Sequence, residues 1–109
     1  MTGPDEQRFA ALARELAELD GVTTPSAEGR RSFGSDALKS DGHIFAMLSA
    51  GRLVVKLPRT RVDELVASGD GERFDAGRGR PMREWLALDP GSPLPWSRLA
   101  REAYAFVHG

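Results

Sequence analysis

Residues 42–58 read GHIFAMLSAGRLVVKLP, and this stretch decides the fold because two β-patterned runs meet in it across a short turn. The runs His43–Ser49 and Arg52–Leu57 are separated by Ala50 and Gly51, and glycine tolerates the positive φ of tight hairpin turns. Pro58 ends the second run, since proline cannot donate to a strand ladder. The stretch therefore predicts a β-hairpin.

The two runs differ in how their apolar residues are spaced. The second run alternates, which is typical of a sheet with one covered face and predicts that Lys56 reaches solvent; its two sets are Leu53, Val55, Leu57 and Arg52, Val54, Lys56. The first run is apolar on both sides, with Ile44, Ala46, Leu48 opposing Phe45, Met47. We expect it to lie centrally, or to be covered on its second face by another element or an oligomer contact.

Outward from the hairpin, apolar spacing and turn residues predict three helices and three further strands. The helices are Asp5–Leu19, closed by Gly21; a short one after Pro58, capped by Thr60 with Asp63 and stopped at Gly69; and Trp96–Val107. The strands are Ala37–Ser40, which the Asp41-Gly42 turn joins to the hairpin, and a second hairpin of Glu72–Ala76 and Met82–Leu88 with its tip at Gly77–Pro81. Residues 22–31 read as a connection with at most a short strand near Val22. The order α-β-β-β-α-β-β-α predicts a two-layer α+β domain, with the helices on one side of an antiparallel sheet.

Size and composition restrict the class of protein. At 109 residues, with 40% hydrophobic and 28% charged residues, the chain is expected to form one domain over residues 1–109. It has no cysteine, which excludes disulfides, thiolate zinc sites and thiol nucleophiles and fits a reducing compartment. No apolar run approaches the roughly 18 residues of a membrane span, so we expect a cytoplasmic protein without a membrane association.

Charge is unevenly distributed although the formal net charge is only −1. Residues 5–20 hold five acidic and two basic residues, whereas residues 28–61 hold seven basic and three acidic ones. Residues 73–83 add four arginines against Asp75 alone. A small negative total argues against strong nucleic-acid binding, but the two basic regions would form one positive face if the fold joined them.

No pattern of residues indicates an enzyme. His43 and His108 are the two histidines, the residue type that most often serves as a base near neutral pH, and neither accompanies a Gly-x-Ser-x-Gly elbow. His43 reads as a solvated turn residue, and His108, next to last in the sequence, is expected to fray. The acidic residues lack metal-ligand spacing and no phosphate-binding Gly-x-x-x-x-Gly-Lys motif occurs, so we expect no catalysis, no metal and no cofactor.

The tip Gly77-Arg78-Gly79-Arg80 is the strongest candidate for binding. Glycine lets backbone amides approach an anion, and guanidinium groups hold phosphate in bidentate fashion. A plain hairpin turn is the competing interpretation, with solvated arginines or arginines paired to Asp75 and Glu84. Phe33, Phe74 and Trp85 would suit a base-stacking platform, but a core role is favoured for Trp85 and for Trp96.

Three segments together resemble one family. They are Ser32-Phe33-Gly34-Ser35, the stretch Gly42–Pro58, and residues 77–85, GRGRPMREW. In this order they are similar to the YjbR/MmcQ family of small bacterial proteins, which is related to the TfoX N-terminal domain. The resemblance implies an α-β(3)-α-β(2)-α fold and a pair of hairpins that has been compared to a double-wing DNA-binding motif. Carried over by position, the wing tips are Ser49–Arg52 and Gly77–Arg80, with Lys56 flanking them.

Two hypotheses of function follow. The first is a DNA-binding module that contacts the phosphate backbone through two basic hairpin wings, with these candidate contacts: Arg30, Arg31, Lys39, Arg52, Lys56, Arg78, Arg80 and Arg83. The second is a domain that binds a protein partner, a second copy of itself or a small ligand, indicated by the doubly apolar strand and the negative net charge.

Overall fold

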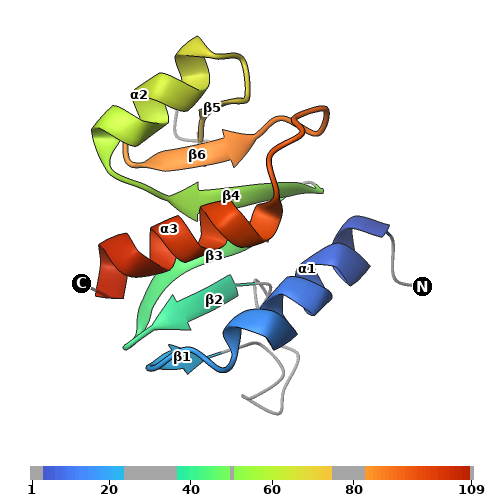
Figure 1. Ribbon diagram of the computed structural model, residues 1–109, viewed down its shortest axis with the longest axis vertical. Coiled ribbons are helices and arrows are strands. Elements are labelled where there is room, and N and C mark those ends of the chain that lie inside the picture. Colours follow the sequence, from blue (N-terminus) through green and yellow to red (C-terminus); the bar gives the residue numbers. More distant parts are fainter. Residues whose placement is uncertain (1–3, 24–36, 50, 75–82, 109) are drawn as a thin grey trace.

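The computed structural model describes residues 4–23, 37–49, 51–74 and 83–108. Nine elements follow one another in these residues (Figure 1): α1 (Pro4–Leu16), β1 (Val22–Thr23), β2 (Ala37–Ser40), β3 (His43–Ser49), β4 (Arg52–Lys56), α2 (Arg59–Ala67), β5 (Gly71–Arg73), β6 (Trp85–Leu88) and α3 (Trp96–His108). The α+β class is confirmed, and the short strand near Val22 is present as β1.

The strands form one antiparallel sheet in the order β1-β2-β3-β4-β6-β5. The two hairpins β3–β4 and β5–β6 are joined through the β4–β6 ladder, in which Val55 pairs with Leu86. The prediction that His43–Ser49 lies centrally is confirmed, because β3 has β2 on one side and β4 on the other.

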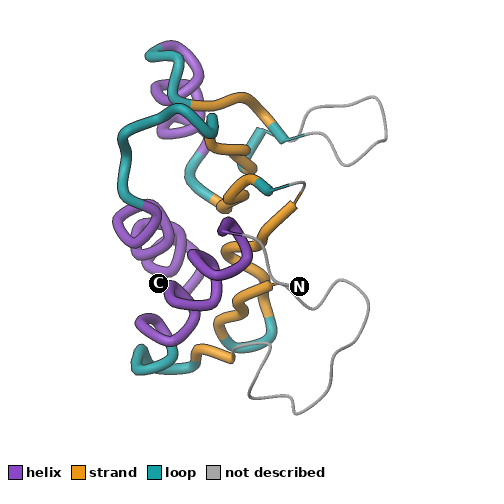
Figure 2. Tube along the Cα trace, turned by 90° about the vertical axis from the view of Figure 1, so that its right-hand side faces the viewer, coloured by secondary structure: helices purple, strands orange, loops and turns teal. Residues whose placement is uncertain are grey.

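The three described helices pack on the same face of this sheet (Figure 2), and we call them the helix layer. All three contribute to a single apolar cluster, through residues such as Leu12 of α1, Val62 of α2 and Leu99 of α3. The sheet adds alternate residues of its central strands, among them Leu53 and Val55 of β4, which are fully buried. Burial of this one-sided apolar stripe is what holds the two layers together.

One bulge changes which residues of β3 enter the core. The β2–β3 register shifts between Leu38 and Lys39, so that Phe45 stands as the extra residue. Both Phe45 and Ala46 are fully buried in the core, and the Phe45 ring contacts Tyr104 of α3 edge-on at a centroid distance of 5.7 Å. The predicted strict alternation is therefore wrong at this point: Phe45 joins the core side, while Ile44 is 37% exposed. An extra residue reverses the inward-outward order on one side of a bulge.

Helix ends also depart from the sequence expectation. Helix α2 begins after Pro58 with no side-chain cap, so the predicted Thr60–Asp63 capping box is wrong, and Asp63 instead pairs with Arg73 of β5. Gly69 does close α2 in the left-handed conformation, with φ of 82°. Helix α1 ends at Leu16, earlier than expected, and Glu15 ties it to α3 by accepting hydrogen bonds from Ser97 and Arg101.

The end of α3 is fixed to the sheet rather than frayed. His108 lies 3.1 Å from the Ser40 hydroxyl through its Nδ1 atom and stacks on Tyr104 at a centroid distance of 4.7 Å. Tyr104 in turn donates a hydrogen bond of 2.6 Å to the carbonyl of Asp20. The expectation that His108 frays is therefore wrong, because side-chain contacts from two other segments hold the last turn of the helix.

Gly71 offers a test of the β5–β6 junction. A Cβ at this position would lie 2.6 Å from the Ala87 carbonyl oxygen, a backbone atom that cannot move aside without distorting β6. We expect Gly71→Ala to lower the free energy of unfolding by about 1–3 kcal/mol in urea denaturation. Gly91→Ala is the matched control, because the nearest atom there belongs to the flexible Asp89 carboxylate, and we expect a change within about 0.5 kcal/mol. Equal losses in the two variants would contradict the close packing of β5 on β6.

Candidate nucleic-acid interface

The sheet face opposite the helix layer gathers a different set of side chains, and we call it the open face. Strand alternation and cross-strand pairing place twelve described residues on it: Ala37, Lys39, Ile44, Met47, Ser49, Arg52, Val54, Lys56, Glu72, Phe74, Trp85 and Ala87. None of them belongs to the buried core cluster under the helices. Three cations, one carboxylate and two aromatic rings thus share one surface with several apolar residues.

Lysine and aromatic side chains occupy one end of this open face. Lys56 pairs with Trp85 across the β4–β6 ladder, and its ammonium group lies 5.9 Å from the centroid of the Trp85 ring. Phe74 follows β5 and donates its backbone N–H to the Trp85 carbonyl at 2.8 Å, so the two aromatic residues are cross-strand neighbours. Lys39 lies opposite Ile44, and extending the β3–β4 register brings Ile44 beside the Lys56 end of β4. The row therefore runs across the strands from Lys39 to Phe74.

Arg52 stands at the other end of β4, about 13 Å from Lys56 at roughly 3.3 Å per residue. Its guanidinium is held by three acceptors: the carbonyl of Leu88 at 3.1 Å, the carbonyl of Ala87 at 3.2 Å and the Glu72 carboxylate at 2.6 Å. The Arg52 side chain is only 24% exposed. Arg52 thus acts as a clamp between β4 and the β5–β6 hairpin, and its charge is largely compensated.

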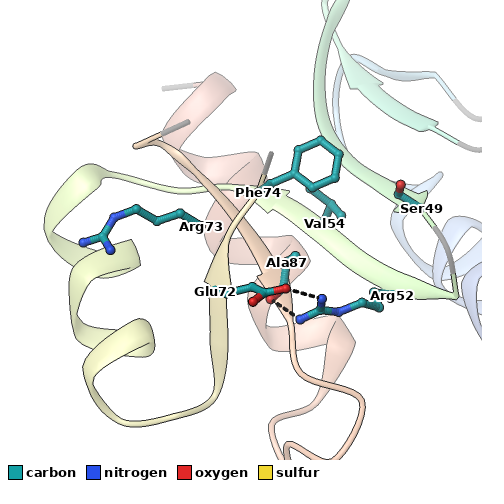
Figure 3. Close-up of a pocket in the computed structure, with 7 residues that line it drawn as sticks. All are labelled: Ser49, Arg52, Val54, Glu72, Arg73, Phe74 and Ala87. Carbon is teal, nitrogen blue, oxygen red and sulfur yellow. Dashed lines mark hydrogen bonds and ion pairs between the residues drawn. The ribbon is translucent and has the colours of Figure 1, made fainter. Parts of the chain in front are cut away.

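A pocket of about 340 Å³ opens beside this clamp (Figure 3). Its described lining is Ser49, Arg52, Val54, Glu72, Arg73, Phe74 and Ala87. The Phe74 ring lies over Val54, while the Arg73 side chain runs toward α2 (Figure 3), where it pairs with Asp63. Val54 and Ala87 are buried behind this lining, and Ser49, Arg52 and Glu72 contribute polar groups to it.

The candidate contacts from the sequence fall into three groups. Lys39, Arg52 and Lys56 come together on the open face. Arg83 is exposed in the turn that precedes β6. Arg30, Arg31, Arg78 and Arg80, like most of the predicted Gly77–Pro81 tip, lie outside the described residues.

The two hairpins do not point the same way. The β3–β4 turn joins Ser49 to Arg52, whereas the residues that flank the β5–β6 connection, Phe74 and Trp85, pair with each other beside Lys56. The two connections therefore leave the sheet at opposite ends of β4. Among the described residues, the sheet cations Lys39, Arg52 and Lys56 lie on the strands between these two connections.

Sequence reasoning missed part of the site and misassigned Trp85. Trp96 is buried in the core as predicted, but Trp85 lies half-buried on the open face, so its predicted core role is wrong. Ser49 belongs to a predicted wing tip, whereas no sequence pattern points to Val54, Glu72 or Ala87 as site residues. The alternation of β4 does place Val54 beside Arg52, but the partnership with Glu72 depends on the register of β5, which short strands do not specify.

The remaining candidates for catalysis are the two histidines and the possible metal ligands. His43 is exposed at the start of β3. His108 approaches Ser40 and also lies 3.4 Å from Asp41, but Ser40 is 1% exposed, so its hydroxyl is closed to a substrate. Within the described part of the chain, no three His, Asp or Glu side chains are grouped to hold a metal ion. Over the same residues, no helix has the length and apolar character needed to cross a membrane.

Comparison with family models, with curated proteins and with solved structures finds no match to the chain. The relationship to the YjbR/MmcQ family stays a prediction from the sequence, and the function is argued from the open face itself.

The Arg52 clamp can be tested by removing either side of it. Arg52→Met leaves the carbonyls of Ala87 and Leu88 without their donor, and we expect it to cost about 1–3 kcal/mol of unfolding free energy. Glu72→Gln removes only a partner that is 67% exposed, and we expect a loss below about 1 kcal/mol that shrinks as salt is added. Urea denaturation at low and high salt measures both. If Glu72→Gln cost as much as Arg52→Met, the ion pair rather than the carbonyl contacts would hold the clamp.

Proposed function

We propose that this protein is a cytoplasmic DNA-associated binding module of the YjbR/MmcQ kind, which holds a phosphate backbone against its open face and performs no catalysis. The observation that carries the proposal is that Lys39 of β2 lies on the same sheet face as Arg52 and Lys56 of β4. Lysine ammonium groups on an exposed sheet can contact successive phosphates without reading the base sequence.

Electrostatics favour this face over the helix layer. In the helix layer, three described arginines are paired with carboxylates: Arg61 with Glu102 at 2.9 Å, Arg101 with Glu15 at 3.0 Å, and Arg98 with Glu102 at 3.9 Å. On the open face, Glu72 is the single carboxylate among the twelve residues, and it is paired with Arg52. Among the described residues, a phosphate therefore meets fewer carboxylates at the Lys56 end of the open face than beside these ion pairs of the helix layer.

A near-neutral total charge is compatible with such a local site. Exposed charges separated by more than about 8–10 Å are largely screened at physiological ionic strength, so the acidic groups of the helix layer weaken the attraction only slightly. Because few phosphates are neutralised, we expect modest affinity and a shallow decrease of affinity with salt, with a slope of about one for each phosphate contact.

An interaction domain for a protein or a small ligand is the second candidate. It is supported by the pocket of about 340 Å³, which lies within the usual range of roughly 300–1,000 Å³ for ligand sites, and by Ile44 as an exposed apolar residue on the same face. A homodimer through the open face belongs to this candidate. Binding of that kind would depend little on salt.

The lysines provide the direct test. We expect the double variant Lys39→Gln/Lys56→Gln to bind a DNA fragment more weakly at low salt, and to reduce the slope of log affinity against log salt by about 2, roughly one for each lost phosphate contact. Fluorescence anisotropy over a salt series measures both quantities.

Arg14→Gln/Arg98→Gln is the matched control, because it removes the same charge from exposed positions in the helix layer. We expect it to leave the slope unchanged. Equal effects of the two double variants would refute the assignment to the open face, and a wild-type protein that binds no DNA at low salt would refute the function.

A further inference from the structure

We infer that the strand held on the open face is single-stranded and that one of its unpaired bases enters the pocket and stacks on Phe74. This inference rests on the proposed function and names the form of nucleic acid that the site takes. It starts from the fact that the open face carries aromatic and apolar groups beside its cations, which a contact made only with phosphates does not require.

Phe74 gives the pocket an aromatic side wall. Its half-buried ring lies over Val54 (Figure 3), which is fully buried, so the Phe74 ring and not the Val54 side chain is the surface on which a base can stack. Every nucleobase has a π-face that stacks on an aromatic side chain, and this contact is tolerant of sequence. In a duplex both faces of a base are already stacked, so only an unpaired base can enter.

Charge orients the strand across the pocket. Inside the pocket the three nitrogens of the Arg52 guanidinium are engaged by Leu88, Ala87 and Glu72, and the Glu72 carboxylate repels phosphate. Outside it, Lys56 lies two strands away from Phe74, about 10 Å at the usual strand spacing. Phosphate is thus favoured at Lys56 and disfavoured in the pocket, which places the base inward and the backbone outward.

Neighbouring groups extend the same arrangement. Trp85 lies between Lys56 and Phe74 in the cross-strand row, with the Lys56 ammonium over its ring. This row offers a second aromatic surface next to the pocket, at the end of the sheet where Lys39 also lies. A single strand that crosses β2, β4 and β6 would meet cation, cation and ring in turn.

The test compares three labelled probes of roughly 12 nucleotides by fluorescence anisotropy at low salt: a mixed-sequence single strand, the same sequence as a duplex, and an abasic strand with the same number of phosphates. We expect the single strand to bind roughly 5- to 100-fold more tightly than the abasic strand, the range that stacking of one base provides. We expect Phe74→Leu to lower single-strand affinity toward the abasic level while leaving abasic binding unchanged.

Phe106→Leu is the matched control, since Phe106 is 38% exposed in α3 and lies in the helix layer. We expect it to leave all three affinities unchanged. The comparison of probes on the unmodified protein decides the inference even if Phe74→Leu fails to fold.

The outcomes separate this inference from the function on which it rests. Three results would overturn the inference that a base stacks on Phe74. They are equal binding of the single strand and the abasic strand, tighter binding of the duplex, or a folded Phe74→Leu variant with unchanged single-strand affinity. If all probes bound equally and more weakly as salt is added, backbone binding would stand without the stacked base. If none bound, the proposed function itself would fail.

Discussion

The two-residue period of β4 is the constraint on which the rest of the structure depends. This strand lies between β3 and β6, so its register fixes the partners of both hairpins. Leu53 and Val55 point into the core under the helices, and Arg52 and Lys56 point to the opposite face. A shift of the register by one residue would exchange these sets and bury Arg52 and Lys56. Because burying charge is unfavourable, the register is fixed, and with it the set of side chains on the open face.

Charge is divided between the two layers in a way that follows from this period. Several arginines of the helices pair with carboxylates on a neighbouring turn or on the next helix, as Arg61 does with Glu64 and Glu102. Among the described residues of the open face, the one carboxylate is Glu72 of the edge strand β5, and it pairs with Arg52. Lys56 faces an aromatic ring instead of an acid. Local surfaces of opposite character therefore coexist in a chain whose formal net charge is −1.

Much of the fold follows from local patterns in the sequence. Local sequence patterns predict three features: the hairpin at residues 42–58, the glycine that closes α2 and the amphipathic C-terminal helix. The structure agrees with all three. The bulge beside Lys39 does not follow from local sequence, because an extra residue in β3 is recognised only when the pairing with β2 is known. The bulge brings Phe45 into the core. The capping of α2 fails for a similar reason, since Asp63 has a stronger partner in Arg73, ten residues further along the chain.

The candidate site, like the fold, can be predicted from the sequence only in part. Alternation alone places Arg52 and Lys56 on one face. That Lys39 lies on the same face can be known only from the order and pairing of the strands. The compensation of Arg52 by two carbonyls and Glu72 could not be foreseen, because it depends on how β5 and β6 are placed beside β4. Trp85 was assigned to the core because aromatic residues usually lie there, whereas its strand parity turns it outward beside Lys56.

Binding of nucleic acid by the open face is the central claim, and backbone amide chemical-shift mapping by NMR tests it most directly. On addition of a single-stranded oligonucleotide at low salt, the account predicts that shifts concentrate at Lys39, Val54, Lys56, Phe74 and Trp85. Amides on the exposed sides of α1 and α3 should stay unchanged. Shifts centred on the helices, or no shifts at saturating oligonucleotide, would contradict the account.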